Sequence, residues 1–337
     1  LKNLASGHTL SCQPGAVHRP PNGGYPSTLT MFYLSTAPAK QQSVGETITV
    51  LSGRLSSATL LEDRRAAIQG LRSFAKDFPA SVASGAIRSL IGSLGKDGDD
   101  VKVVLETLLM LFNPNRDSPE ASDEIVLWLA DEFTQRQDNI TLLLDFVDSP
   151  DFYSRLYALQ LLTAILAART QRTEECVFTA PLGISRLVAA LNDGRDAIRN
   201  EAISLLTALT PTSIEIQKLV AFENAFEKLF AIIEADGALY EGGRTVEDCL
   251  ILLANLLRRN ASNQSLFRES GCMRDLAGLL QGLLEAQLPA AEDVAAWAEI
   301  QRNRNIYAFL AIIRLFLPIG ATGLLQNQNA LWKQGLV

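Results

Sequence analysis

Histidine is almost absent from this sequence, and its absence limits the chemistry available to the chain. His8 and His18 are the only histidines among 337 residues, so residues 31–337 contain none. This excludes a histidine-activated serine or cysteine nucleophile, and a histidine-ligated metal site, from that part of the chain. The turn at 92–97 has the wrong glycine spacing for a phosphate-binding loop. We expect a protein that is not an enzyme, with no catalytic residues, no metal and no cofactor.

Cysteine is also scarce. Cys12, Cys176, Cys249 and Cys272 are far apart and include no Cys-x-x-Cys pair. This spacing does not support a zinc site or a redox motif. Cys249 lies beside an apolar helical stripe, which favours a buried structural thiol over a ligand or a disulfide. Because reduced thiols are typical of cytosolic proteins, we expect a cytoplasmic location.

Positive charge and long apolar runs are both limited. The 30 basic and 37 acidic side chains give a net charge of −7. A chain of this charge is a poor binder of polyanions, so nucleic acid is not expected as a partner. The longest apolar run, at 306–325, contains Arg314, Pro318 and Gly320. It favours a buried helix followed by a turn over a membrane span, and any membrane association is expected to be peripheral.

Leucine, alanine and isoleucine are abundant, and they recur at helical spacing. Hydrophobic residues make up 47% of the chain and aromatic residues only 7%, which is typical of interlocking helices. In Thr245–Leu280 an apolar stripe is followed by a polar turn, a short helix, a turn at Gly271 and a third apolar run. Units of this kind cannot bury both faces alone, so they stack, as in armadillo and HEAT proteins.

The same pattern returns along the chain. Its equivalent apolar positions are separated by roughly 37 to 60 residues, which brackets the armadillo and HEAT period. These positions are Leu71, Leu108, Leu162, Leu206, Leu253 and Ile313. We predict an all-α, armadillo/HEAT-like right-handed helical solenoid of about six repeats.

Both ends of the sequence depart from this pattern. Residues 1–43 are rich in proline and have no period, so we expect a disordered N-terminal extension, with natural translation beginning at Met31. Residues 330–337 resemble the beginning of another repeat, so we expect 44–337 to be an incomplete armadillo-like globular head, truncated at its C-terminus. Loops rich in proline, glycine or acidic residues are expected at 113–123, 235–244 and 285–293.

One mixed-charge stretch is the strongest signal for a binding surface. Charged and amide side chains are dense at 193–201 and at 217–228, beginning with Gln217 in the second segment. They form either the solvated outer face of two helices or a protein-binding ridge, whose mixed signs would give specificity and register more than affinity. The candidate partner-binding residues are Arg195, Arg199, Asn200, Glu201, Lys218, Glu223, Asn224 and Glu227.

Several short strings are more specific than the period. They are PLGISRL at 181–187, IRNE at 198–201, IQKLVAFENAFE at 216–227, VEDCLILL at 246–253, LLEDRR at 60–65 and QDNITLLL at 137–144. These strings closely resemble the globular head of the general vesicular transport factor family, the Golgi vesicle-tethering proteins with a long coiled coil. The resemblance covers about residues 44–337. The coiled coil and acidic tail of that family have no counterpart in this sequence.

The resemblance implies a cytosolic tether, peripheral on Golgi and transport-vesicle membranes, that acts in endoplasmic reticulum-to-Golgi and intra-Golgi transport. It implies an armadillo head that binds a Rab-type small GTPase, SNARE proteins and other Golgi tethers. It also implies a homodimer, which in the full-length protein forms through the coiled coil.

Two other functions fit a helical solenoid. One is an armadillo-type guanine-nucleotide exchange factor for a small GTPase, an enzyme without covalent chemistry and therefore without a catalytic motif. The other is a peptide receptor of the nuclear-import kind, which would have asparagines repeated along its inner helices. Asn255 occupies such a position, but the corresponding segments LLTALT and LLTAIL offer threonine or alanine instead.

Overall fold

The computed structural model describes residues 42–95, 100–286, 296–320 and 322–336. Within these ranges the regular secondary structure is helical, without strands. The first helices are α1 (Val44–Ser57), α2 (Leu61–Asp77), α3 (Pro79–Ser93), α4 (Val101–Phe112), α5 (Asp123–Thr134) and α6 (Gln137–Phe146). Next come α7 (Phe152–Ala168), α8 (Thr170–Thr179), α9 (Gly183–Ala189), the 3-10 turn η1 (Ala190–Asn192), α10 (Asp196–Leu209), α11 (Ile214–Phe222) and α12 (Ala225–Ala235). The last are α13 (Ala238–Glu241), α14 (Arg244–Leu257), α15 (Ala261–Glu269), α16 (Cys272–Glu285), α17 (Ala296–Leu315) and α18 (Leu324–Lys333).

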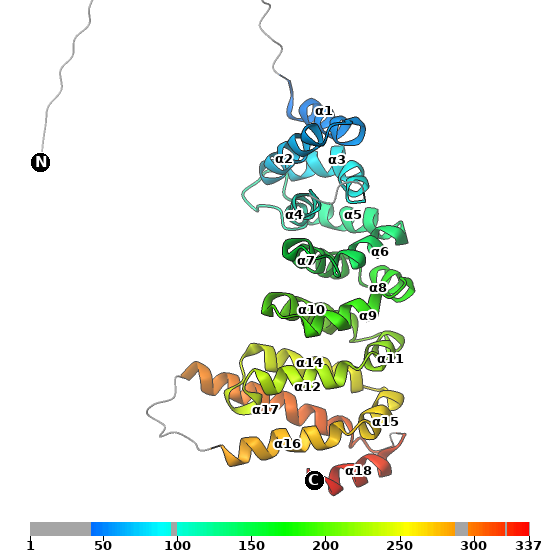
Figure 1. Ribbon diagram of the computed structural model, residues 1–337, viewed down its shortest axis with the longest axis vertical. Coiled ribbons are helices and arrows are strands. Elements are labelled where there is room, and N and C mark those ends of the chain that lie inside the picture. Colours follow the sequence, from blue (N-terminus) through cyan, green and yellow to red (C-terminus); the bar gives the residue numbers. More distant parts are fainter. Residues whose placement is uncertain (1–41, 96–99, 287–295, 321, 337) are drawn as a thin grey trace, which may run out of the picture. The chain divides into compact units, whose positions relative to one another are not determined.

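Six of these helices pack directly on one another. The contacts run from α2 to α4 and on to α7, α10, α14 and α17, and we call these six helices the central stack (Figure 1). Each contains one of the six apolar positions expected to be equivalent, and those side chains are at most 8% exposed. The prediction of an all-α solenoid is therefore confirmed. The period in the sequence is the distance along the chain between successive members of the stack.

Other helices connect one member of the central stack to the next. The chain forms α8 and α9 between α7 and α10, and it forms α15 and α16 between α14 and α17 (Figure 1). The unit expected in Thr245–Leu280 is present as α14, α15 and α16. Gly271 separates the last two with a φ of 86°, a left-handed conformation that glycine adopts without a steric penalty.

The segment expected to be a loop at 113–123 links α4 to α5, and it is tied to neighbouring helices. The Ser118 hydroxyl donates to the backbone carbonyl of Asp77 at 2.8 Å. The Glu120 carboxylate accepts hydrogen bonds from the backbone N–H of Ser81 at 2.9 Å and from its hydroxyl at 2.7 Å. This linker is therefore anchored to α2 and α3.

The other expected loops and the long apolar run had different outcomes. Part of 235–244 is the short helix α13, because Leu239 is fully buried and needs an ordered backbone around it. Residues 287–293 of the third expected loop, and residues 1–41 of the expected extension, lie outside the described residues. The run at 306–325 is interrupted where α17 ends at Leu315, as expected. Among the described helices, none combines the length and the apolar character that a membrane span requires.

A buried polar residue recurs where the chain leaves the central stack. It is the fourth residue of α8, α11, α15 and α18, and we call these four positions the polar joints: Thr173, Gln217, Gln264 and Asn327. Their side chains are at most 6% exposed. The Gln217 amide donates to the carbonyl of Thr210 at 2.8 Å, and the Gln264 amide donates to the carbonyl of Leu257 at 3.0 Å. They thus satisfy carbonyls at the C-terminal ends of α10 and α14, which have no partner within their own helix.

Side-chain amides also connect one polar joint to the next. The Asn263 amide donates to the carbonyls of Gln217 at 3.0 Å and Leu256 at 2.8 Å. The Asn260 amide donates to the side-chain oxygen of Gln217 at 3.1 Å, and the Asn327 amide donates to that of Gln264 at 3.0 Å. The expectation that Gln217 belongs to an exposed strip was therefore wrong, because its side chain is 2% exposed and bonded on both sides.

We predict that Asn263→Ala destabilises the protein by on the order of 2 kcal/mol, because two buried carbonyls lose a donor. The urea midpoint followed by circular dichroism measures this change. Asn303→Ala, at an exposed position on α17, is the matched control and should shift the stability by less than about 0.5 kcal/mol. Equal effects of the two substitutions would contradict a structural role for Asn263.

Candidate partner-binding surface

The first candidate residues lie at the beginning of α10. Arg195 precedes the helix and is exposed, and its guanidinium carbon lies 4.7 Å from the ring centroid of Phe152 on α7. Arg199 donates to the backbone carbonyl of Asp193 at 2.8 Å and forms an ion pair with Asp196. Arg199 is therefore engaged within its own turn, whereas Arg195 lies over an aromatic ring at the surface.

Asn200 and Glu201 connect α10 to both of its neighbours in the central stack. The Gln160 amide on α7 donates to the Glu201 carboxylate at 2.8 Å. The Thr245 hydroxyl on α14 donates to the side-chain oxygen of Asn200 at 3.4 Å. Together with Arg195 and Arg199 they form what we call the α10 patch.

The remaining candidates lie on α11 and at the start of α12. Lys218 forms an ion pair with Glu215 on the same helix, at 3.1 Å. The Glu223 carboxylate accepts a hydrogen bond from the Ser185 hydroxyl on α9 at 2.5 Å. Asn224 has a φ of 60° and precedes α12, whose first turn contains the exposed Glu227. We call these four candidates the α11 patch.

The candidate residues do not form one continuous strip. The α10 patch occupies the first half of α10, whereas α11 follows the other end of that helix. A helix of fourteen residues is about 21 Å long, so the two patches lie at opposite ends of α10. Closeness in sequence had suggested one surface, but the chain turns after α10 and separates the two groups.

Sequence reasoning missed an aromatic cluster beside the α10 patch. The rings of Phe152 and Tyr153 are 5.1 Å apart edge to face, and those of Tyr153 and Tyr157 are 5.8 Å apart. Tyr153 is 50% exposed. Burial, and to a smaller degree the charge of Glu106 on α4, raises the pKa of Tyr157. The signal that could have found this cluster is the string FYSRLY at 152–157, in a chain that is only 7% aromatic.

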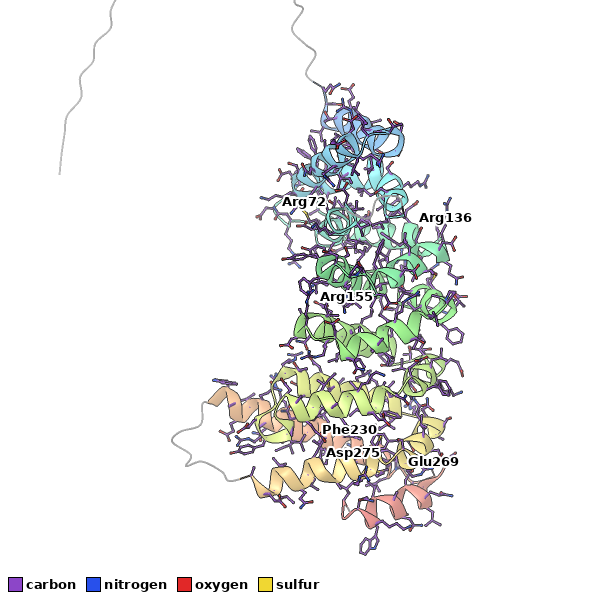
Figure 2. All side chains as sticks on the ribbon, viewed as in Figure 1. Arg72, Arg136, Arg155, Phe230, Glu269 and Asp275 are labelled. Carbon is purple, nitrogen blue, oxygen red and sulfur yellow. The ribbon has the colours of Figure 1, made fainter. Side chains whose placement is uncertain are left out.

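The face of the stack continues towards the N-terminal helices. Arg72 on α2 forms an ion pair with Glu106 on α4. Figure 2 shows Arg72 and Arg136 at opposite edges of the described helices, with Arg136 in the turn between α5 and α6. The charge of Glu106 acts on Tyr157, whose ring adjoins the aromatic cluster under Arg195, so this edge continues into the α10 patch.

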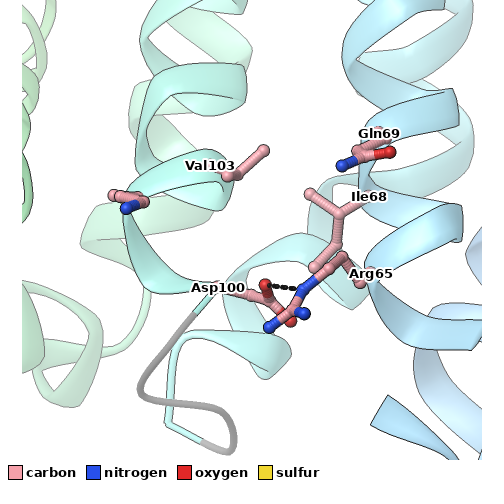
Figure 3. A pocket seen from close by; sticks show the side chains of 6 residues that line it. Arg65, Ile68, Gln69, Asp100 and Val103 are labelled. Atoms are coloured by element: carbon pink, nitrogen blue, oxygen red, sulfur yellow. Dashed lines mark hydrogen bonds and ion pairs between the residues drawn. The ribbon is translucent and has the colours of Figure 1, made fainter. Parts of the chain in front are cut away.

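A hollow of about 380 Å³ lies between α2 and α4 (Figure 3). Its polar lining includes an ion pair, in which Arg65 Nε donates to the Asp100 carboxylate at 2.7 Å. Asp100 is only 4% exposed, so this pair fixes the beginning of α4 against α2. The described residues contain no group of three or more histidine, cysteine or acidic side chains that could hold a metal ion.

The cysteines of the described ranges are buried. Cys176, Cys249 and Cys272 are free thiols and are buried. Burial raises the pKa of Cys249 to about 12, and it also raises the pKa of the other two thiols. The thiolate, which is the nucleophilic form, is therefore scarce at neutral pH. The expectation that Cys249 is a buried structural thiol is confirmed, and Cys176 and Cys272 are buried as well.

Comparison with curated proteins identifies relatives of the chain. It is 39% identical over 323 residues to the intracellular protein transport protein USO1 of Saccharomyces cerevisiae, and the aligned region covers 87% of this chain and 18% of that protein. It is 34% identical over 310 residues to the general vesicular transport factor p115 of Homo sapiens, and the aligned region covers 88% of this chain and 31% of that protein. The chain belongs to the general vesicular transport factor family. It spans less than a third of the length of either relative.

A solved structure of a family member agrees with this assignment. A crystal structure of Uso1 matches with a TM-score of 0.78 and 38% identity, covering 87% of this chain and 48% of the solved chain. No family model matches the sequence. The family is therefore assigned from the relatives and from the similarity of the solenoid.

The structure also bears on the alternative of a peptide receptor. Asn255 on α14 is 7% exposed, and its amide donates to the carbonyl of Thr207 on α10 at 3.1 Å. This asparagine therefore links two helices of the central stack. Its amide is engaged with the protein's own backbone, where a peptide receptor would need it free.

We predict that Cys176, Cys249 and Cys272 resist alkylation by iodoacetamide at mildly alkaline pH until the protein is denatured. The reason is that each thiol is buried and its pKa is raised. Mass spectrometry of the labelled peptides, before and after urea, measures this directly. Rapid labelling of Cys249 in the native protein would contradict the burial described above.

Proposed function

We propose that this chain is the head of a vesicle-tethering factor for endoplasmic reticulum-to-Golgi and intra-Golgi transport. The observation that carries this is similarity over 87% or more of the chain to proteins named for intracellular and vesicular transport. In this function the solenoid surface binds a Rab-type small GTPase, SNARE proteins and other Golgi tethers, and it catalyses no reaction. The protein is cytoplasmic and peripheral on Golgi and vesicle membranes, and the longer protein is a homodimer.

Capture is the mechanism that such a head supports. A GTPase anchored in one membrane binds the head, while another part of the longer protein holds the second membrane. Holding the two membranes together raises the effective concentration of SNARE proteins at the contact, without any new contact between them. A rigid stack of helices suits this role, because it presents its side chains in a fixed arrangement before the partner arrives.

Of the two patches, the α10 patch has the composition of a docking site. Arginine and tyrosine are enriched among the residues that dominate binding energy, and here Arg195 lies over the ring of Phe152, which Tyr153 also contacts. The α11 patch offers Lys218 and Glu223, whose charges already have partners within the protein. Mixed charges around the α10 patch favour selection of one partner among similar surfaces.

We predict that the chain binds one or more Rab-type GTPases in the GTP-bound form without accelerating nucleotide release. Binding to a panel of such GTPases in both nucleotide states, with nucleotide release followed in the same samples, tests this. A tether recognises the active GTPase, and it has no reason to stabilise the nucleotide-free form. Preference for the nucleotide-free form with accelerated release would instead indicate a guanine-nucleotide exchange factor.

Substitutions should separate the two patches. Tyr153→Ala combined with Arg195→Glu is expected to weaken GTPase binding by about tenfold or more, because it removes the exposed aromatic anchor and its arginine. Lys218→Glu in the α11 patch is the matched control and should change the affinity less than threefold, on the order of 0.6 kcal/mol. Equal thermal midpoints would show that the variants are folded. Unchanged binding by the double variant would remove the α10 patch as the GTPase site.

A further inference from the structure

Three arginines surround a second hollow, at the C-terminal ends of α14 and α17. Arg258 and Arg259 directly follow α14, and Arg314 lies in the last turn of α17. All three are exposed, and they line a hollow of about 520 Å³. None of the residues that line this hollow belongs to the α10 patch or the α11 patch.

None of these three guanidinium groups has an acidic or hydrogen-bonding partner among the described residues. Arginines elsewhere in the described ranges are commonly paired, as Arg169 is with Asp131 at 2.7 Å. The chain as a whole has a net charge of −7. Three like charges around one hollow repel each other, so their clustering is unfavourable until a partner supplies negative charge.

Helix capping does not account for the cluster. Arginine near the end of a helix often bonds its last carbonyls, which carry partial negative charge. Here the Gln264 amide already donates to the carbonyls of Leu257 and Leu315, at 3.0 and 3.3 Å. The polar joint therefore leaves the three guanidinium groups available to bind something else.

The walls of the hollow narrow the choice of partner. Between the arginines, Ala254 on α14 and Ala311 and Leu315 on α17 supply an apolar lining. Guanidinium groups bind carboxylates in a bidentate manner, and the apolar lining accommodates a small aliphatic side chain. A bilayer surface is flat, so its headgroups are poorly matched to a recess of this kind.

We propose that this hollow, which we call the arginine hollow, binds an acidic peptide segment of a partner protein. In the segment, carboxylates flank an aliphatic residue. The carboxylates pair with Arg258, Arg259 and Arg314, and the aliphatic side chain contacts the alanines between them. This site gives the head a second contact, chemically different from the α10 patch, so that two partners can be bound together.

Fluorescence anisotropy with labelled synthetic peptides and the full chain tests the arginine hollow. The probe is a peptide in which glutamates flank a central pair of leucines, and its control has glutamine at each glutamate. We expect binding of the acidic peptide, no measurable binding of the amide peptide, and a marked loss of affinity between about 50 and about 500 mM salt. Equal binding of the two peptides, or no binding of either, would overturn the proposal.

Substitutions place the binding in the hollow. Arg314→Glu should weaken the binding of the acidic peptide by about tenfold or more, and so should the double substitution Arg258→Glu with Arg259→Glu. Arg54→Glu at the exposed end of α1 makes the same charge change elsewhere and should leave the affinity unchanged within about twofold. The single variant and the double variant are both measured, so that the test still stands if the thermal midpoint shows that one of them does not fold. Affinities equal to that of the wild type would show that the peptide binds elsewhere.

Binding to lipid vesicles tests the alternative that the arginine hollow binds an anionic membrane surface. Sedimentation with phosphatidylcholine vesicles, with and without phosphatidylserine, measures attraction to an anionic lipid surface. We expect less than a twofold effect of Arg314→Glu on vesicle binding. If the chain bound the anionic vesicles through Arg314 and ignored the acidic peptide, the arginine hollow would be a lipid site and the peptide proposal would fail.

Discussion

The structure depends on one requirement, which is that long apolar helices must be buried on two sides while their terminal carbonyls still find hydrogen-bond donors. The central stack meets the first part, because α4, α7, α10 and α14 each pack between two other members. The polar joints meet the second part, with amide side chains that reach the ends of α10 and α14. Buried carbonyls without donors would cost enough free energy to offset much of the apolar burial, so the two solutions have to coexist.

This division of roles leaves the exposed face of the stack available for recognition. At the N-terminal ends of α7 and α10, Tyr153 and Arg195 form an aromatic and charged surface. At the C-terminal ends of α14 and α17, Arg258 and Arg314 form a basic one. The two regions are held at fixed positions by the same packed core. Partners that bind them would therefore be arranged by the spacing of the helices and not by a flexible linker.

The solenoid could be predicted because apolar residues recur along the sequence at the spacing of its repeats. Leu162 and Leu253 recur at equivalent positions because each helix of the stack buries the same face. The polar joints could not be predicted, since a glutamine such as Gln217 between charged residues resembles a solvated side chain, and only the neighbouring repeat shows that it is buried. The division of the candidate residues into two patches was missed for a related reason: sequence proximity says nothing about the turn that follows α10. The partner-binding roles of both patches stay predictions.

The polar joints also have a mechanical consequence. A stack of repeats behaves as a spring when its ends are pulled, and it yields first where fewer buried amide hydrogen bonds join neighbouring repeats. In α3 and α5, which follow α2 and α4, the position equivalent to the joints is apolar: it is the buried Val82 in α3 and the partly buried Val126 in α5. From α10 onward, hydrogen bonds run from Thr210 through Gln217 and Gln264 to Asn327. Under load, the C-terminal repeats would therefore be the stiffer part of the chain, and extension would begin among the N-terminal ones.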